Sequence, residues 1–327
     1  MANSINKPRG LRIRAVIGAA LTLVSVCASA GVDDARQWLD RMSTAMQSLN
    51  YQGTFVYLHG GEIETMRIVH SRDESGERER LLSLNGEARE VIRDDNSVTC
   101  IWPGTRAVTV SKARPRTPFP ATIPGPERLE AHYRIVTQGE ARIAGMLARV
   151  IAIQPRDEFR YGYRIWLDRE TDLLLRSDLL DDAGLPVEQV MFTELQVLDH
   201  IPAERFEPIL TGTGYTWTTE DENSAMIPDP MWKVQSLPPG YSMTKRDKKP
   251  MMPDDNGVEH MVYTDGLATV SVFIEPLGDG QERLEGASRM GAVNVFGAVD
   301  RDYQITVVGE VPAATVQYIA QAVVYNP

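Results

Sequence analysis

Acidic pairs and histidines are the side chains of this 327-residue chain that catalysis or metal binding would require. The acid pairs stand beside turn residues, where aspartate is favoured because it accepts hydrogen bonds from nearby backbone amides; they are Asp94-Asp95, Asp181-Asp182 and Asp254-Asp255. The histidines are dispersed, without the spacing of a metal site; they are His59, His70, His132, His200 and His260. The sequence therefore predicts no catalytic site, no metal site and no cofactor, and a protein that is not an enzyme. An acid–base pair assembled from distant strands stays open.

Charge is the second chemical signal. Lys and Arg number 34 against 45 Asp and Glu, which gives a formal net charge of −11. An acidic protein of this kind is not expected to bind nucleic acid. Two local basic clusters stand against this background, namely Lys245, Arg246, Lys248 and Lys249, and then Lys112, Arg114 and Arg116. Such clusters suit a phosphate, a lipid head group or an acidic partner segment, and a solvated loop is the plain alternative.

Two expected strands are rich in aromatic residues. Residues 51–59 place Tyr51, Phe55 and Tyr57 on one face. Residues 159–167 alternate strictly between the faces, with Tyr163 and Ile165 among the residues on the apolar side. A curved sheet with these side chains has a concave face that either the protein itself or a ligand must fill. The residues by themselves leave both readings open.

The elements that would position these residues follow from hydrophobic periodicity. Apolar residues at spacings of three and four predict a helix over residues 35–49. The period then changes, and some eleven short runs of β-branched and aromatic residues extend to residue 205, separated by turn signals. No helices alternate with them, so we expect one strongly curved antiparallel sheet or open barrel. The proline-rich Pro115–Pro126 segment is expected to be a surface loop or a lid.

A second domain is indicated by a change in composition. Residues 206–228 combine prolines, glycines and an acidic run, which is typical of a linker between domains. Residues 229–327 then show strand patterns and a closing helix over residues 312–324. The predicted fold class is α+β and mainly β, with a large open antiparallel β-barrel, a helix and a lid, linked to a smaller α+β domain.

The first 30 residues predict export. Four basic residues precede an apolar run of thirteen residues, Ala15 to Cys27, and Ala28-Ser29-Ala30 follows the run. These are the parts of a cleavable signal peptide, and the run is too short to cross a bilayer as a helix. Cleavage after Ala30 would change the net charge from −11 to −15 and leave Cys100 without a disulfide partner. We therefore expect an exported protein without internal disulfides.

Several segments together resemble one protein family. They are Gln47–Phe55, Tyr161–Asp168, Ser177–Asp181, Tyr263–Leu267 and Ile305–Pro312. In this order and spacing, from the signal peptide to the last helix, the chain resembles the RseB/MucB family of periplasmic sigma-E regulatory proteins. None of these segments is catalytic, so the resemblance depends on their number and order.

The resemblance implies a function. It implies a large domain similar to lipoprotein carriers, with a hydrophobic cavity, and a negative regulator of the sigma-E envelope-stress response. Such a regulator binds the periplasmic domain of a transmembrane anti-sigma factor, protects it from regulated proteolysis, and releases it on binding lipopolysaccharide or mislocalised lipoprotein. The implied partners are the anti-sigma factor and lipid acyl chains. A periplasmic lipoprotein or lipid carrier is the alternative, and homo-oligomerisation is left open.

The resemblance also gives the expected domains and sites. Residues 1–30 are expected to form the signal peptide, 31–205 the lipid-sensing domain, 206–228 the linker and 229–327 the partner-binding domain. The expected lipid-binding residues are Phe55, Tyr57, Met66, Ile68, Trp102, Tyr163, Ile165 and Met191. The expected partner-binding residues are Lys245, Arg246, Lys248 and Lys249. A register error of one residue would exchange the lipid-facing set for its neighbours.

Overall fold

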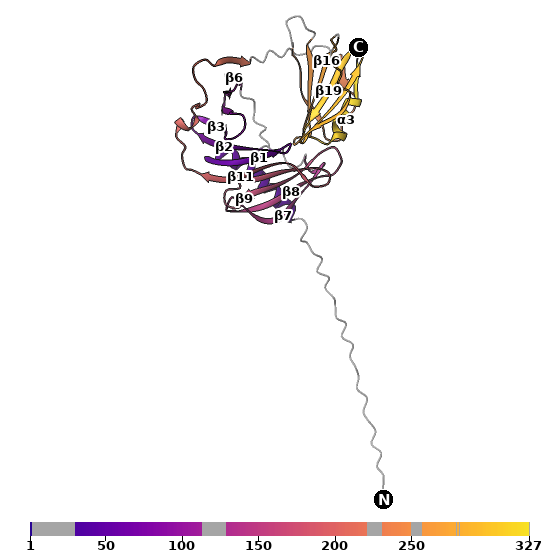
Figure 1. Ribbon diagram of the computed structural model, residues 1–327. Helices are drawn as coiled ribbons and strands as arrows, with labels where there is room; N and C mark the ends of the chain where they lie inside the picture. The colour runs from indigo at the N-terminus through magenta and orange to yellow at the C-terminus, as the bar shows by residue number, and fades with distance from the viewer. Residues whose placement is uncertain are drawn as a thin grey trace.

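The computed structural model describes residue 1 and residues 30–112, 129–220, 231–249, 257–278, 280 and 282–326 (Figure 1). Residues 2–29 of the predicted signal peptide, and the whole Pro115–Pro126 segment, lie outside these residues. Among the helices within them, none has the length and apolar character needed to cross a membrane.

A single long helix, α1 (Ala30–Ser48), opens the large domain. Its apolar residues recur every three or four positions and therefore form one stripe along the helix. The stripe, which includes Leu39, Met42 and Met46, is buried against the sheet in the same core as Tyr51 and Ile151. The helix thus fills part of the concave face.

The large domain is built on a twelve-stranded sheet in the order β12-β6-β5-β4-β3-β2-β1-β11-β10-β9-β8-β7. Its strands are β1 (Tyr51–His59), β2 (Glu62–Asp73), β3 (Gly76–Ser83), β4 (Glu90–Asp94), β5 (Ser97–Trp102), β6 (Ala107–Lys112), β7 (Tyr133–Ile143), β8 (Met146–Pro155), β9 (Gly162–Asp168), β10 (Leu174–Leu180), β11 (Pro186–Val197) and β12 (Thr216–Glu220). All neighbouring strands among β1 to β11 pair antiparallel. Strands β7 and β12 are the two edges of the sheet and are not paired with each other, so the sheet is not closed. The prediction of a curved, open antiparallel sheet is confirmed.

The beginning of the expected linker belongs to the large sheet. Strand β12 pairs in parallel with β6, and the short helix η1 (Ala203–Phe206) precedes it. Between them, the backbone amides of Ile209 and Leu210 donate to the buried carboxylate of Glu90, which also pairs with Arg80 at 2.6 Å. The chain therefore leaves the large domain only after residue 220, because these bonds hold it to the outer face of the sheet.

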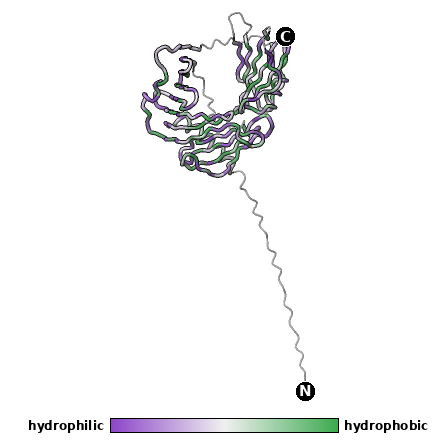
Figure 2. Tube along the Cα trace, in the orientation of Figure 1, coloured by the Kyte–Doolittle hydropathy of each residue, from purple (hydrophilic) through white to green (hydrophobic). Residues whose placement is uncertain are grey.

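The small domain is a six-stranded sheet in the order β14-β15-β16-β19-β18-β17, with a separate β13–β20 pair and one helix. Its elements are β13 (Trp232–Val234), β14 (Ser242–Lys249), β15 (Val258–Thr264), β16 (Thr269–Pro276), β17 (Gly286–Met290), β18 (Val293–Asp300), β19 (Tyr303–Gly309), α3 (Ala313–Gln321) and β20 (Val323–Tyr325). Helix α3 buries Val316 and Ile319 against the core of this sheet. Hydrophilic and hydrophobic residues alternate along many strands, as expected for sheets with one face on a core (Figure 2).

Candidate interdomain binding site

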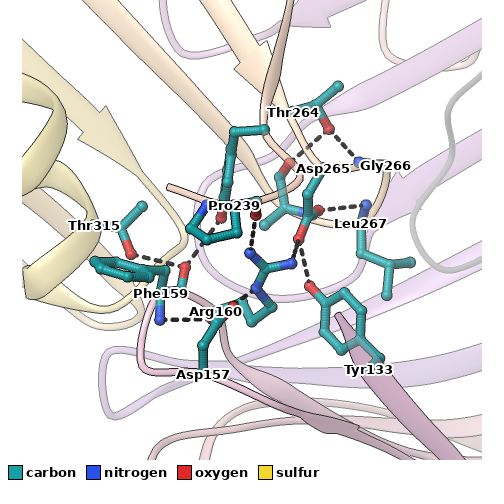
Figure 3. Close-up of polar contacts among 12 residues, drawn as sticks. Tyr133, Asp157, Phe159, Arg160, Pro239, Thr264, Asp265, Gly266, Leu267 and Thr315 are labelled. Carbon is teal, nitrogen blue, oxygen red and sulfur yellow. Dashed lines mark hydrogen bonds and ion pairs between the residues drawn. The ribbon is translucent and has the colours of Figure 1, made fainter. Parts of the chain in front are cut away.

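The loop between β8 and β9, residues 156–161, carries most of the polar contacts between the two domains. Arg160 lies at its centre and is 2% exposed. Its Nε donates to Asp157 at 2.9 Å within the loop, and its Nη2 donates to the carbonyl oxygen of Pro239 in the small domain. Its Nη1 forms an ion pair of 3.1 Å with Asp265, in the turn between β15 and β16 (Figure 3). A buried arginine of the large domain is therefore neutralised partly by the small domain.

Asp265 accepts hydrogen bonds at both of its carboxylate oxygens. One carboxylate oxygen accepts the backbone amides of Leu267 at 2.9 Å and Ala268 at 2.8 Å, which shape the turn. The other oxygen accepts the hydroxyl of Tyr133 at 2.8 Å, in addition to the Arg160 ion pair. Asp265 thus connects a turn of the small domain to β7 and to the β8–β9 loop of the large domain (Figure 3).

Aromatic rings enclose this ion pair. The guanidinium of Arg160 lies 5.4 Å from the ring centres of both Tyr133 and Tyr241, within the range of cation–π attraction. Burial, together with the charge of Asp265, raises the pKa of Tyr133 well above its usual range. The Tyr133 hydroxyl therefore stays protonated and keeps donating to Asp265 at any physiological pH.

Phe159 is held from the small domain as well. Its carbonyl oxygen accepts the hydroxyl of Thr315 at 2.8 Å and that of Tyr241 at 3.1 Å. Its ring meets Tyr318 of α3 edge-on, with 5.3 Å between the ring centres. The loop is therefore held by contacts with helix α3 and with the residue that precedes β14.

Apolar and backbone contacts extend the junction. Leu267 and Ala292 of the small domain pack into the core of the large domain. Asn294 of β18 donates to the Tyr161 hydroxyl at 3.0 Å. Gly240 has a φ of +84°, and a side chain there would meet the His132 ring at 2.3 Å, so only glycine fits this turn.

A cavity of about 280 Å³ lies beside these contacts, also between the domains. Strands β1, β9, β10 and β11 form its walls, and Glu310, at the end of β19, reaches it from the small domain. Inside it, the Tyr57 hydroxyl donates to Glu188 at 3.0 Å. Tyr163 lines the cavity, and burial, followed by the charges of Glu310 and Asp265, raises its pKa well above the usual range. The cavity and the Arg160–Asp265 ion pair are thus both built from residues of the two domains.

The predicted lipid-binding residues fall into three groups. Phe55, Tyr57 and Tyr163 line the cavity. Ile68 and Ile165 are buried in the core beneath α1, and Met66 is buried opposite Phe55 on the neighbouring strand. Trp102 is half-buried and lies several strands away from Ile68. Cross-strand pairing leads from Ile68 through Leu81 and Val91 to Cys100. Because Trp102 stands two residues after Cys100, its side chain lies on the same face of the sheet as Ile68.

Met191 is the exception. It pairs with Val56 and Arg176, whereas its neighbours Val190 and Phe192 pair with Tyr57 and Phe55. Since successive residues of a strand point to opposite faces, Met191 lies on the face away from the cavity. The structure therefore does not bring it together with the other members of the set.

The basic run lies on β14, an edge strand rather than a loop. Lys245 pairs with Asp247 at 2.5 Å, and Arg246 pairs with Glu259 and donates to the carbonyl oxygen of Trp232. Lys248 is half-buried, and the side chain of Lys249 lies outside the part that the structure describes. Two of the four cations therefore already face carboxylates of their own domain.

The sequence prediction did not include Arg160, Asp265, Glu188 or Glu310. Asp265 stands in a Thr-Asp-Gly turn, where an aspartate is explained by the turn alone. Arg160 did carry a signal, because it interrupts the aromatic pair Phe159 and Tyr161 with a charge. The two glutamates carry no local signal, since they meet only when the domains dock.

Comparison with known proteins covers both domains. The MucB/RseB N-terminal domain family matches residues 34–210, and the MucB/RseB C-terminal domain family matches residues 227–324. The chain is 35% identical over 297 residues to the sigma factor AlgU regulatory protein MucB of Pseudomonas aeruginosa, which covers 89% of this chain and 90% of that protein. It is 29% identical over 302 residues to the sigma-E factor regulatory protein RseB of Escherichia coli, which covers 88% of this chain and 90% of that protein.

A solved structure is similar over nearly the same length. The crystal structure of MucB in complex with MucA(peri) matches with a TM-score of 0.69 and 31% identity, covering 90% of this chain and 100% of the solved one. The resemblance inferred from the sequence motifs is confirmed by these matches. The relatives of this chain are sigma-factor regulatory proteins, and the chain belongs to the MucB/RseB family.

Proposed function

We propose that the protein regulates a sigma factor by binding the periplasmic domain of a transmembrane anti-sigma factor and protecting it from regulated proteolysis. The observation that carries the proposal is the match of both domains, in order, to a relative whose structure contains MucA(peri). The predicted signal peptide over residues 1–30 supports action in the periplasm. Binding and shielding need no catalytic residues, which agrees with the prediction that the protein is not an enzyme.

The second part of the proposal is release of the partner by lipid, as lipopolysaccharide or mislocalised lipoprotein. It is supported by a row of half-buried side chains across β3, β4 and β5, namely Leu81, Val91, Cys100 and Trp102. Burial of one acyl methylene group contributes about 0.8 kcal/mol. Two to four such groups therefore match a coupling free energy of about 1–3 kcal/mol between two sites. The lipid must bind the partner-free form more tightly, since equal affinity for both forms shifts nothing.

A lipid carrier is the alternative, and the same apolar row would serve it. The extensive docking of a second domain onto the β8–β9 loop favours regulation, because a carrier needs only the lipid-binding domain. The basic strand β14, through Lys248 above all, is the part of the small domain that we assign to an acidic stretch of the partner.

The test is a pull-down of the mature chain with the periplasmic segment of the anti-sigma factor, with and without lipopolysaccharide. We expect binding that lipid reduces, and we expect Trp102→Ser to weaken the effect of lipid. Trp217→Ser is the matched control, because Trp217 is 58% exposed on the edge strand β12. Absence of binding to the segment would contradict the proposal and favour the carrier.

A further inference from the structure

The interdomain cavity has an unusual charge arrangement. Glu188 of the large domain and Glu310 of the small domain both line it, and among the described residues that line it there is no Lys, Arg or His. Within the described chain, neither carboxylate has a cationic partner. Partial removal from water, together with the charge of Glu188, raises the pKa of Glu310. The docked domains therefore hold two like charges at a shared cavity without compensation.

A buried hydroxyl in the same cavity also lacks a partner. Ser177 is 2% exposed, lines the cavity, and its Oγ makes no hydrogen bond within the described residues. A buried polar group without a partner costs about 1–3 kcal/mol, so such a group calls for a ligand or an ordered water. The Ser177 hydroxyl can accept a hydrogen bond from a donor placed between the two carboxylates.

The remaining walls are apolar. Phe55, Leu179 and Val190 line the cavity beside the polar groups. Its volume of about 280 Å³ lies just below the range of roughly 300–1,000 Å³ that small-molecule sites occupy. The cavity is therefore large enough for a single extended side chain or a small amine, and too small for a whole lipid.

We propose that this cavity binds the cationic end of an alkylammonium or alkylguanidinium group, supplied by a lysine or arginine side chain of the bound partner segment. The stem of the side chain packs against Phe55 and Leu179, and its head donates to Glu188, Glu310 and Ser177. The inference rests on the proposed function for its source of the cation. Because the two carboxylates belong to different domains, an occupied site holds the small domain in its docked position.

Other ligands fit this chemistry less well. A phosphate would face two carboxylates, and an acyl chain would supply no counter-charge to either of them. A calcium ion takes six to eight oxygen ligands, whereas no group of three or more metal-ligating side chains occurs within the described residues. The pair of glutamates with an apolar wall therefore selects an organic cation.

The first experiment uses the full mature chain and n-hexylammonium as the probe, measured by calorimetry at pH 7. We expect n-hexylammonium to bind, and hexan-1-ol, which has the same chain without the charge, to bind at least tenfold more weakly. Glu188→Gln and Glu310→Gln should each reduce affinity for the ammonium about tenfold, or about 1.4 kcal/mol. Glu207→Gln is the matched control, because Glu207 is an exposed glutamate remote in sequence from the cavity. Equal binding of the alcohol and the ammonium, or no effect of either glutamate variant, would overturn the proposal.

The second experiment identifies the source of the cation. Each lysine and arginine of the anti-sigma segment is replaced by methionine, and binding to the wild-type chain and to Glu310→Gln is compared. One replacement should weaken binding to the wild type about tenfold and have little further effect on Glu310→Gln. A segment that binds the wild type and both glutamate variants equally would overturn the assignment to a partner side chain. A segment that fails to bind the wild type contradicts the proposed function instead, and the n-hexylammonium titration then decides the cation site by itself.

Discussion

Two sets of charged side chains lie between the domains, and they differ in how their charges are compensated. Around Arg160, opposite charges meet beside the rings of Tyr133 and Tyr241, and the carboxylate of Asp265 accepts three hydrogen bonds in addition to the ion pair. Around Glu310, like charges meet at an open cavity, and a buried hydroxyl has no partner among the described residues. The first set joins the two domains through compensated charges. The second explains where an added group could strengthen or weaken the docking.

The largest expected effect comes from the compensated set. Asp265→Ala leaves the buried guanidinium of Arg160 with less counter-charge, and breaking a buried pair in this way costs about 3–5 kcal/mol. We expect the domains to separate, since an open arrangement returns Arg160 to water. Small-angle scattering should show a larger radius of gyration, and denaturant unfolding should lose its single transition.

Asp178→Ala is the control for this prediction. Asp178 is 1% exposed and pairs with Arg176 at 2.7 Å, but both residues lie on β10 of the large domain. The control should lower the free energy of unfolding without expanding the molecule. A compact, fully stable Asp265→Ala variant would remove the basis of the comparison.

A smaller loss is expected for Tyr133→Phe. The change removes only the hydroxyl that donates to Asp265 at 2.8 Å, and a hydrogen bond to a charged group is worth about 1.5–3 kcal/mol. The ring, and its contact with Arg160, should remain. Urea unfolding of the variant measures this loss, and Tyr57→Phe, which removes the 3.0 Å bond to Glu188 in the incompletely filled cavity, should cost less. Equal losses would show that the two sets do not differ in strength.

The backbone of the junction gives a third prediction. Gly240→Ala introduces a side chain at a φ of +84° that also collides with His132 of the large domain. Gly139→Ala introduces one at a φ of +96° with no atom within 4 Å. Both variants carry backbone strain, but Gly240→Ala should lose about 1–3 kcal/mol more because only it is overpacked. Thermal unfolding of the two variants measures the difference, and equal losses would mean that the turn is free to move away from His132.

The smallest effect is expected at the cavity and depends on pH. The pKa of Glu310 is raised in the folded protein from an ordinary value of 4.5, and the titratable groups that face it are Glu188, Tyr57 and Tyr163. The folded state thus binds the proton more tightly than the unfolded state, so stability falls as the pH rises through the folded pKa. Glu310→Gln should therefore stabilise the unliganded protein at pH 7 by less than about 1 kcal/mol, since the group is partly exposed. The gain should vanish below pH 4.5, and an unchanged gain at low pH would exclude the charge of Glu310 as its cause.

Much of the fold could be predicted from the order and period of the residues. The helix over residues 35–49 and the succession of short antiparallel strands that follows it agree with the structure, whereas β12, from within the expected linker, adds a twelfth strand to the large sheet. Strand β7 continues through Gly139, with an irregular register between Thr137 and Glu140. A glycine in a strand signals either a turn or a bulge, and only the pairing partner decides between them.

The candidate site was less accessible to prediction. Phe55, Tyr57 and Tyr163 could be found because aromatic alternation marks one face of a strand. Met191 was grouped with them although its register places it on the other face, since a shift of one residue exchanges the faces. The charges that meet across the junction come from turns far apart in the sequence, and each of them has a sufficient local explanation.

The family, the two-domain organisation, the acidic balance and the curved antiparallel sheet could be inferred from the residues alone, because these depend on local period, composition and the order of motifs. Three features became evident only in the folded chain: Arg160 pairs with Asp265, Glu188 and Glu310 line one cavity, and helix α1 packs in the core of the large domain. These contacts join distant segments, and their energies come from burial, which is a property of the assembled chain. Asp265, which the sequence explains as a turn residue, therefore links the two domains once it is buried against Arg160.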